Sequence, residues 1–168
     1  MTAAPPTPDQ WVLLAYRLPR LPSTPRSAVW RKLRRLGVAQ LTDGLVALPA
    51  DDRTKEAFEW LAEEIIEYDG EATVWLGQPA DTTSAAVMRE RMSAAITVEY
   101  EAVAEEATIS LTDDEVVRRR VAARLRRELA RIHARDFFPP AARRGAERAV
   151  DHLVATTDTR TGTSGAKR

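Results

Sequence analysis

Basic side chains are concentrated between residues 17 and 35, where their type and spacing suit the binding of an anion. The candidate binding residues among them are Arg17, Arg26, Arg31, Lys32, Arg34 and Arg35, and Arg20 lies in the same segment. Such groups contact nucleic-acid phosphates through an attraction that does not depend on base sequence and that weakens with salt. Arginine also makes bidentate contacts to guanine edges and to tetrahedral oxyanions. We interpret these residues as a candidate DNA- or oxyanion-binding site; the alternative is a solvated surface whose charges pair with acidic residues.

A second basic array occupies the later part of the chain. Its members are Arg118, Arg119, Arg120, Arg124, Arg126, Arg127, Arg131 and Arg135. The simplest explanation is pairing across an antiparallel helix hairpin with the acidic residues Glu99, Glu101, Glu105 and Glu106. Such pairs contribute little individually to stability and mainly set the packing register. Whether the array is functional or only paired stays open.

Residues for catalysis are scarce. The chain has no Cys, which excludes disulfides and thiolate chemistry. His133 and His152 have no recognised ligand or catalytic spacing, and a cluster at Glu63, Glu64 and Glu67 is typical of solvated helix surface. No phosphate-binding glycine loop or nucleophile elbow is present. We therefore expect no enzyme activity, no metal site and no cofactor.

The net charge of zero conceals a segregation of charge along the chain. Residues 1–42 carry seven basic and one acidic side chain, residues 43–115 carry four and nineteen, and residues 116–148 carry eleven and three. Blocks of like charge create local potentials even where the total vanishes. Neutrality is therefore no evidence against a polyanionic partner.

The first half of the chain alternates between strand and helix patterns. We predict strands at 11–16, 38–42, 45–49 and 73–76, with a tight Asp43-Gly44 turn between the second and third. Thr24 is predicted to cap a helix that ends at Gly37, and Asp51 a second helix through Asp69. The class is α+β: a ferredoxin-like βαββαβ order with a four-stranded antiparallel sheet. Trp30 and Trp75 are expected in the core or at a dimer interface.

The second half is predicted to be helical, with a hairpin followed by a short helix. Apolar periodicity predicts helices at 84–107, 112–135 and 142–154, the second opened by a capping box of Thr112 and Glu115. The predicted domains are a disordered N-terminus (1–9), the ferredoxin-like domain (10–79), a helical extension (80–155) and a disordered tail (156–168). No apolar run approaches the roughly 20 residues that span a bilayer, and no secretory signal is recognised. We expect a cytoplasmic protein with no membrane partner.

Several segments together resemble the N-terminal domain of the chromate-resistance regulator ChrB. They are residues 11–19, the WRKLRRLG block within 29–38, residues 41–49, Glu99-Tyr100 and the Arg135-Asp136-Phe137-Phe138 segment. The resemblance covers about residues 10–154. It implies a bacterial regulator, expected to be a homodimer, that binds promoter DNA of a chromate-efflux operon and releases it when chromate is present. It also implies a C-terminal domain that senses chromate, which this chain is expected to lack.

The first-half topology is also similar to the small CRISPR-associated endoribonuclease fold and to the middle domain of the phenylacetate repressor PaaX. In the nuclease family an Asp at the end of the first strand holds the metal, whereas Tyr16-Arg17 stands here. A cation at this place opposes metal binding, which argues against a metal nuclease. The alternative to a DNA-binding regulator is an accessory stress protein that binds chromate, another oxyanion or a protein partner.

Overall fold

The computed structural model describes residues 10–159, with side chains to residue 155, and divides the chain into two compact units. Unit 1 ends at Met92 and unit 2 begins at Ser93, so the division falls within helix α3 (Thr82–Ile109). The predicted domain boundary at residue 79 lies just before that helix and stays a prediction. The predicted disordered N-terminus (1–9) and residues 160–168 of the predicted disordered tail (156–168) lie outside the described residues, whereas residues 156–159 form the end of a helix.

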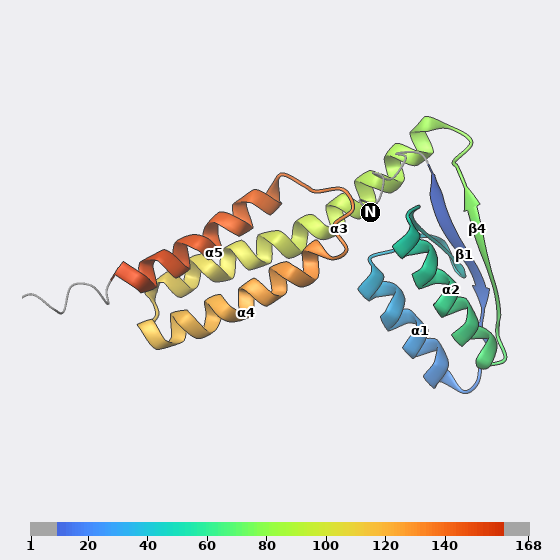
Figure 1. The fold of residues 1–168 in the computed structure, drawn as a ribbon, viewed down its shortest axis with the longest axis horizontal. Helices are drawn as coiled ribbons and strands as arrows, with labels where there is room; N and C mark the ends of the chain where they lie inside the picture. Colours follow the sequence, from blue (N-terminus) through green and yellow to red (C-terminus); the bar gives the residue numbers. More distant parts are fainter. Residues whose placement is uncertain (1–9, 160–168) are drawn as a thin grey trace, which may run out of the picture. The chain divides into compact units, whose positions relative to one another are not determined.

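Unit 1 has the predicted βαββαβ order of elements. These are β1 (Trp11–Arg17), α1 (Ser23–Leu36), β2 (Ala39–Thr42), β3 (Leu45–Pro49), α2 (Asp52–Glu67) and β4 (Glu71–Gly77). The strands form one antiparallel sheet in the order β2-β3-β1-β4. Figure 1 shows α1 and α2 side by side against the sheet, which confirms the α+β class.

The core of unit 1 follows from the apolar patterns of the helices and the central strands. Val29 and Leu33 of α1 are buried, as are Phe58, Leu61 and Ile65 of α2. The predicted turn is confirmed at Gly44, where φ is +78° and a Cβ atom would lie 2.4 Å from the Tyr16 carbonyl oxygen. Only glycine fits that backbone without strain.

Helix ends in unit 1 match the predictions in part. Asp51 caps α2, since the Thr54 amide donates to its carboxylate at 2.6 Å, and Gly37 ends α1 with φ of 71°. The predicted cap at Thr24 is wrong. The helix begins at Ser23 after Pro22, which has extended backbone and supplies no side-chain cap. Similarly, α2 ends at Glu67 rather than Asp69.

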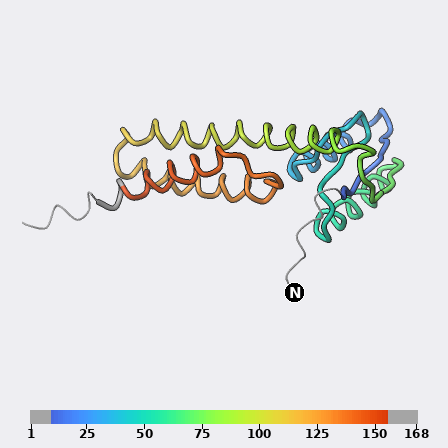
Figure 2. Tube along the Cα trace, turned by 90° about the horizontal axis from the view of Figure 1, so that it is seen from above, coloured from blue at the N-terminus to red at the C-terminus, as the bar shows by residue number. Residues whose placement is uncertain are grey.

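Unit 2 contains three helices around one core. The part of α3 from Ser93, a short 3₁₀ turn η1 (Ser110–Thr112), α4 (Glu115–His133) and α5 (Ala142–Thr159) make up this unit. Figure 2 shows the three helices running alongside one another. Buried residues from all three form a single cluster that includes Tyr100, Leu125, Ile132, Val150 and Leu153. The last helix, at 18 residues, is longer than predicted and extends past residue 154.

The predicted cap of α4 at Thr112 is also wrong. Thr112 lies in η1 and its hydroxyl donates to the Ile109 carbonyl at 3.1 Å. Asp114 is the cap instead, since its carboxylate accepts from the Val117 amide at 3.0 Å. The 3₁₀ turn displaces the start of the helix by two residues, which sequence spacing alone does not reveal.

Candidate nucleic-acid interface

Helix α1 carries five basic residues and no acidic one, and its burial pattern separates them from the core. Val29 and Leu33 are buried, and the positions at 30, 31, 34 and 35 are exposed. Since residues three and four apart share a helix side, Trp30, Arg31, Arg34 and Arg35 form one outward surface. We call these four residues the α1 basic face.

Arg31 and Arg35 have no ion pair within the part of the chain that the structure describes. The Arg34 guanidinium lies 4.8 Å from the centroid of the Trp30 ring, close enough for a cation–π contact. Stacking leaves the guanidinium edge able to donate hydrogen bonds. The α1 basic face therefore presents three arginine side chains to solvent, with one of them held in place by an aromatic ring.

The other three candidates are occupied by partners from the chain itself. Lys32 pairs with Glu64 of α2. Arg26 donates to the Pro19 carbonyl at 3.2 Å, and Arg17 pairs with Glu71 of β4 at 2.7 Å. The structure therefore brings Arg31, Arg34 and Arg35 together and places Arg17 at the sheet, away from that surface. Salt bridges at exposed positions are weak and exchangeable.

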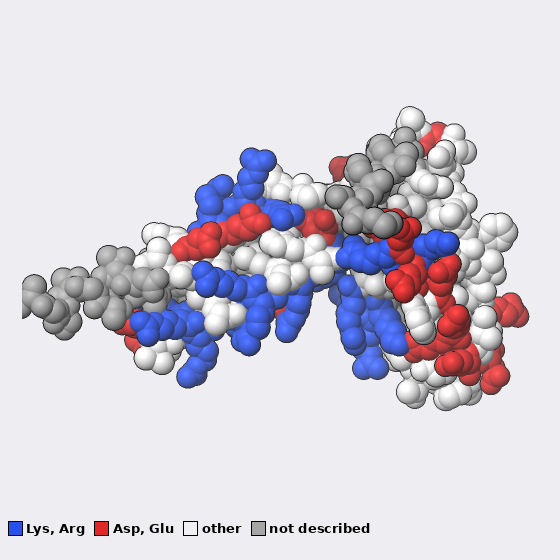
Figure 3. Space-filling model, viewed as in Figure 1, with Lys and Arg blue, Asp and Glu red and all other residues white. Residues whose placement is uncertain are grey.

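Acidic residues gather on the neighbouring helix rather than on α1. Six acidic and two basic side chains lie on α2. In Figure 3 the basic side chains over α1 adjoin acidic ones over α2. Lys32 and Glu64 form an ion pair between the two helices, whereas Arg31, Arg34 and Arg35 have no ion pair within residues 10–159.

The expectation that Trp30 or Trp75 lies in the core is wrong for both. Trp30 is 52% exposed and Trp75 is 60% exposed. Trp30 belongs to the α1 basic face. Trp75 pairs with Leu13 in the β4–β1 register, and strand alternation puts this pair on the opposite face of the sheet from buried Leu14.

The later arginine array is neutralised only in part. The predicted pairing across helices is present for Arg124 with Glu106 and for Arg135 with Glu99. Arg119 and Arg131 pair within α4, with Glu115 and Glu128. Arg118 is 1% exposed and donates to the Asp113 carbonyl at 2.7 Å. Within the described residues, Arg120, Arg126 and Arg127 have no ion pair.

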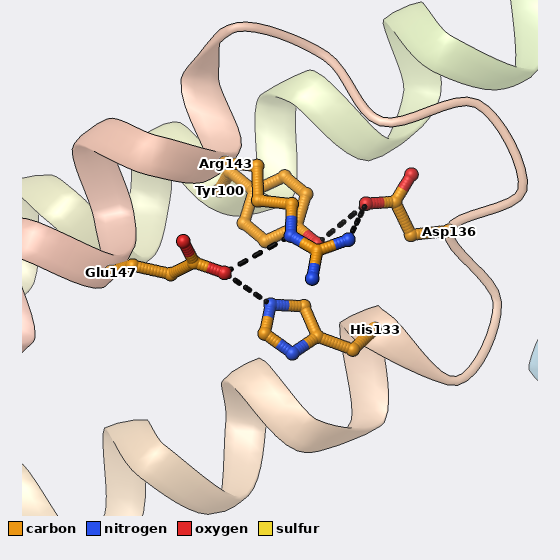
Figure 4. Close-up of polar contacts among 5 residues, drawn as sticks. All are labelled: Tyr100, His133, Asp136, Arg143 and Glu147. Atoms are coloured by element: carbon orange, nitrogen blue, oxygen red, sulfur yellow. Dashed lines mark hydrogen bonds and ion pairs between the residues drawn. The ribbon is translucent and has the colours of Figure 1, made fainter.

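Unit 2 also contains a polar cluster that sequence reasoning missed. Figure 4 shows Tyr100 of α3 and Arg143 of α5 directed toward Asp136. The Tyr100 hydroxyl donates to Asp136 Oδ2 at 2.8 Å, and Arg143 Nη1 lies 3.5 Å from the same atom. Burial, followed by the hydrogen bond to Asp136, raises the pKa of Tyr100. The neutral phenol is therefore the form that the fold stabilises.

Glu147 extends this cluster toward α4. It accepts from Arg143 Nε at 3.0 Å and lies 3.2 Å from His133 Nε2. The cluster thus ties α3, α4, α5 and the segment before α5 together. In the sequence, the family resemblance included Glu99-Tyr100 and residues 135–138. It did not indicate that Tyr100 and Asp136 contact each other.

An open pocket of about 720 Å³ lies beside this cluster, at the start of α5. Its lining is rich in arginine: Pro139, Pro140, Ala141, Arg143, Arg144, Glu147 and Arg148. Arg144 and Arg148 are exposed and have no ion pair in the described part of the chain. The sequence signal was an Arg-Arg pair separated from two prolines by two alanines.

The described residues hold no group of three or more His, Cys, Asp or Glu side chains suited to a metal ion. Glu64 of the acidic α2 cluster is engaged by Lys32 and by the Tyr68 hydroxyl. At the end of β1, Tyr16 and Arg17 stand as predicted, and burial raises the pKa of Tyr16. Within residues 10–159, no helix has the length and apolar character needed to cross a membrane.

Comparison with known proteins agrees with the resemblance seen in the sequence. Residues 26–113 match the family described as Protein ChrB, N-terminal. Protein ChrB of Cupriavidus metallidurans is 33% identical over 150 residues, which cover 88% of this chain and 46% of that protein. The chain therefore spans about half the length of this curated relative.

A solved structure shares the fold. An uncharacterized protein from Mycobacterium tuberculosis matches with a TM-score of 0.50 and 13% sequence identity, over 91% of this chain and 64% of that one. At this identity the likeness concerns the fold alone. The family match covers most of α1, where the α1 basic face lies, together with β2, β3, α2, β4 and α3, and it begins after β1. The chain belongs to the ChrB N-terminal family.

Proposed function

We propose that this chain is the DNA-binding part of a chromate-responsive transcriptional regulator and that it contacts promoter DNA through the α1 basic face. It acts by binding in the cytoplasm, and neither catalyses a reaction nor needs a cofactor. Membership of the ChrB family supports the regulatory role. The observation that carries DNA binding is the outward side of α1, where Arg31, Arg34 and Arg35 have no carboxylate partner among the described residues.

The chemistry of this face suits a nucleic acid. Exposed guanidinium groups bind phosphates and can read guanine edges in the major groove, which is wide enough to admit a helix. Trp30 adds a rigid aromatic surface beside them. Lys32 and Arg26 lie at the margins of α1, where their present partners are a surface carboxylate and a carbonyl that a phosphate can replace.

An electrophoretic mobility shift on the promoter of the chain's own operon tests this proposal. We expect salt-sensitive retardation by the native chain and its loss in the variant R31A/R34A/R35A. The control variant R53A/K55A removes basic charge from α2 and should bind normally. Absence of retardation by the native chain, or unchanged binding by the α1 variant, contradicts the proposal.

The proposal includes a homodimer formed through β4. Among the strands of residues 10–159, β4 lies at the edge of the sheet and has β1 as its one neighbour. Trp75 and Leu76 of this strand are exposed on opposite faces of the sheet, and an edge strand can pair with a second chain. A dimer would present two α1 basic faces to two half-sites of an operator.

A second candidate function is oxyanion binding without DNA contact, and the pocket at the start of α5 favours it. Arg143, Arg144 and Arg148 surround this pocket, and arginine forks suit tetrahedral anions such as chromate. Calorimetric titration with chromate and with sulfate tests this candidate. Saturable binding that R144Q/R148Q abolishes would support it, whereas no heat from either anion rejects it.

A further inference from the structure

Helix α4 carries a line of four arginines along its solvent side. Arg120, Arg124, Arg127 and Arg131 repeat at the spacings of four, three and four residues that keep side chains on one side of a helix. The buried residues of α4 lie at 118, 122, 125, 129 and 132. The four arginines are all exposed and lie opposite that core. We call them the α4 arginine line.

Pairing within the chain neutralises only part of this line. Arg120 and Arg127 have no ion pair among the described residues. Arg124 pairs with Glu106, and Arg131 pairs with Glu128 at 3.0 Å, both at exposed positions. Exposed pairs contribute little and exchange readily. Arg120 and Arg127 therefore add two positive charges without a carboxylate partner among the described residues, and Figure 3 shows basic side chains over α4.

The arrangement opposes the stability of the free helix. Like charges at i,i+3 and i,i+4 destabilise a helix, and the line contains such neighbours at 120 and 124, 124 and 127, and 127 and 131. A polyanion bound along the line would relieve this repulsion. The line spans about 17 Å at a rise of 1.5 Å per residue, and duplex DNA offers about one phosphate charge per 1.7 Å of its axis.

We propose that the α4 arginine line is a second nucleic-acid contact surface, which binds the phosphate backbone without reading base sequence. The inference rests on the proposed function for its partner, but it concerns a separate helix in the other unit. In this arrangement the α1 basic face selects the site, and the α4 arginine line adds affinity to any duplex.

The test is the salt dependence of binding, measured by fluorescence anisotropy on a promoter duplex and on a scrambled duplex of equal length. In R120Q/R127Q we expect weaker binding to both duplexes by the same factor. The slope of log K against log salt should fall by about two, since each phosphate contact contributes about 0.9.

The matched control is R119Q/R126Q, which removes two arginines at the same spacing from the flank of the same helix. It should keep the native slope. Circular dichroism melting should show both variants folded, because all four positions are exposed. A native slope in R120Q/R127Q, or an equal loss in both variants, overturns the inference.

The variant R31A/R34A/R35A, measured in parallel, separates this inference from the proposed function. Loss of binding in the α1 variant alone would reject the α4 surface and leave the proposed function standing. Loss in R120Q/R127Q alone would reject the role of α1 instead. Native protein that binds neither duplex rejects both. Sedimentation could instead show that R120Q/R127Q dissociates a dimer while the salt slope of DNA binding stays native. That result would reject the DNA contact and assign the α4 arginine line to contact with a second copy of the chain.

Discussion

Tyr100 and Asp136 form a polar contact between two buried side chains in unit 2. Tyr100 is fully buried, and the Asp136 side chain is 1% exposed. Asp136 Oδ1 has no hydrogen-bond partner in the described structure, so the carboxylate depends on the contacts of Oδ2 with Tyr100 and Arg143. Removal of the phenol hydroxyl would leave a buried carboxylate with a single weak contact.

The variant Tyr100→Phe should therefore lower the free energy of unfolding by about 1–3 kcal/mol, the cost of leaving a buried polar group unsatisfied. Urea denaturation at neutral pH measures this loss. Tyr68→Phe is the control, since the Tyr68 hydroxyl donates at 3.2 Å to Glu64, which keeps Lys32 as a partner. An equal, small loss in both variants would contradict the account.

The same tyrosine predicts a dependence on alkaline pH. Its pKa is raised in the folded state, so the fold binds the phenol proton more tightly than the unfolded chain does. This stability is fully present below the unfolded pKa of about 10 and is lost as pH rises through the higher folded value. Thermal melts from neutral to alkaline pH should show a steeper decline in the native chain than in Tyr100→Phe. Parallel curves would refute the prediction.

At the scale of elements, the start of α4 distinguishes two capping residues. Asp114→Ala should lower the free energy of unfolding by about 1 kcal/mol, the usual cost of losing an N-cap. Thr112→Ala should cost less, because its hydroxyl contacts only the Ile109 carbonyl at the surface. Chemical denaturation of both variants measures the difference. A larger loss in the free energy of unfolding for Thr112→Ala would contradict this account and favour the capping box predicted from the sequence.

Features set by short-range chemistry were predictable from the sequence. The Asp43-Gly44 turn, the Asp51 cap and the buried stripes of α1 and α2 depend on neighbouring residues and on helical periodicity. Features set by tertiary packing could not be predicted from the sequence. The exposure of Trp75, the 3₁₀ turn before α4 and the Tyr100–Asp136 contact, 36 residues apart, depend on how distant segments meet.

In the candidate site, too, some features were predictable from the sequence and others were not. The basic composition of α1 could be read directly, but the separation of Arg31 and Arg35 from Lys32 and Arg17 could not. Lys32 and Arg17 are occupied because α2 and β4 bring Glu64 and Glu71 beside them. Which cations stay free depends on tertiary neighbours that have no fixed sequence spacing.

At the scale of the whole molecule, the zero net charge is a balance of separate surfaces. Helices α1 and α4 each carry an excess of five positive charges, and α2 carries an excess of four negative ones. Association with a polyanion should therefore depend strongly on ionic strength although the chain as a whole is neutral.

The proposed dimer gives a prediction at this scale. Trp75→Ala should shift the chain toward the monomer in sedimentation equilibrium, because an exposed aromatic residue on an edge strand would be lost from the interface. Trp60→Ala removes a tryptophan that is 66% exposed on α2 and should leave the association unchanged. A native chain that stays monomeric at every concentration, or two variants with equal effects, would exclude an interface at β4.

The central claim is that promoter DNA contacts the outward side of α1. The most direct measurement is a ¹H–¹⁵N NMR titration of the 18.7 kDa chain with a promoter duplex. The account predicts that amide shifts and line broadening concentrate on α1, with the indole signal of Trp30 and the guanidinium signals of Arg31, Arg34 and Arg35 among the most affected. A titration in which binding occurs while α1 stays unperturbed would contradict it.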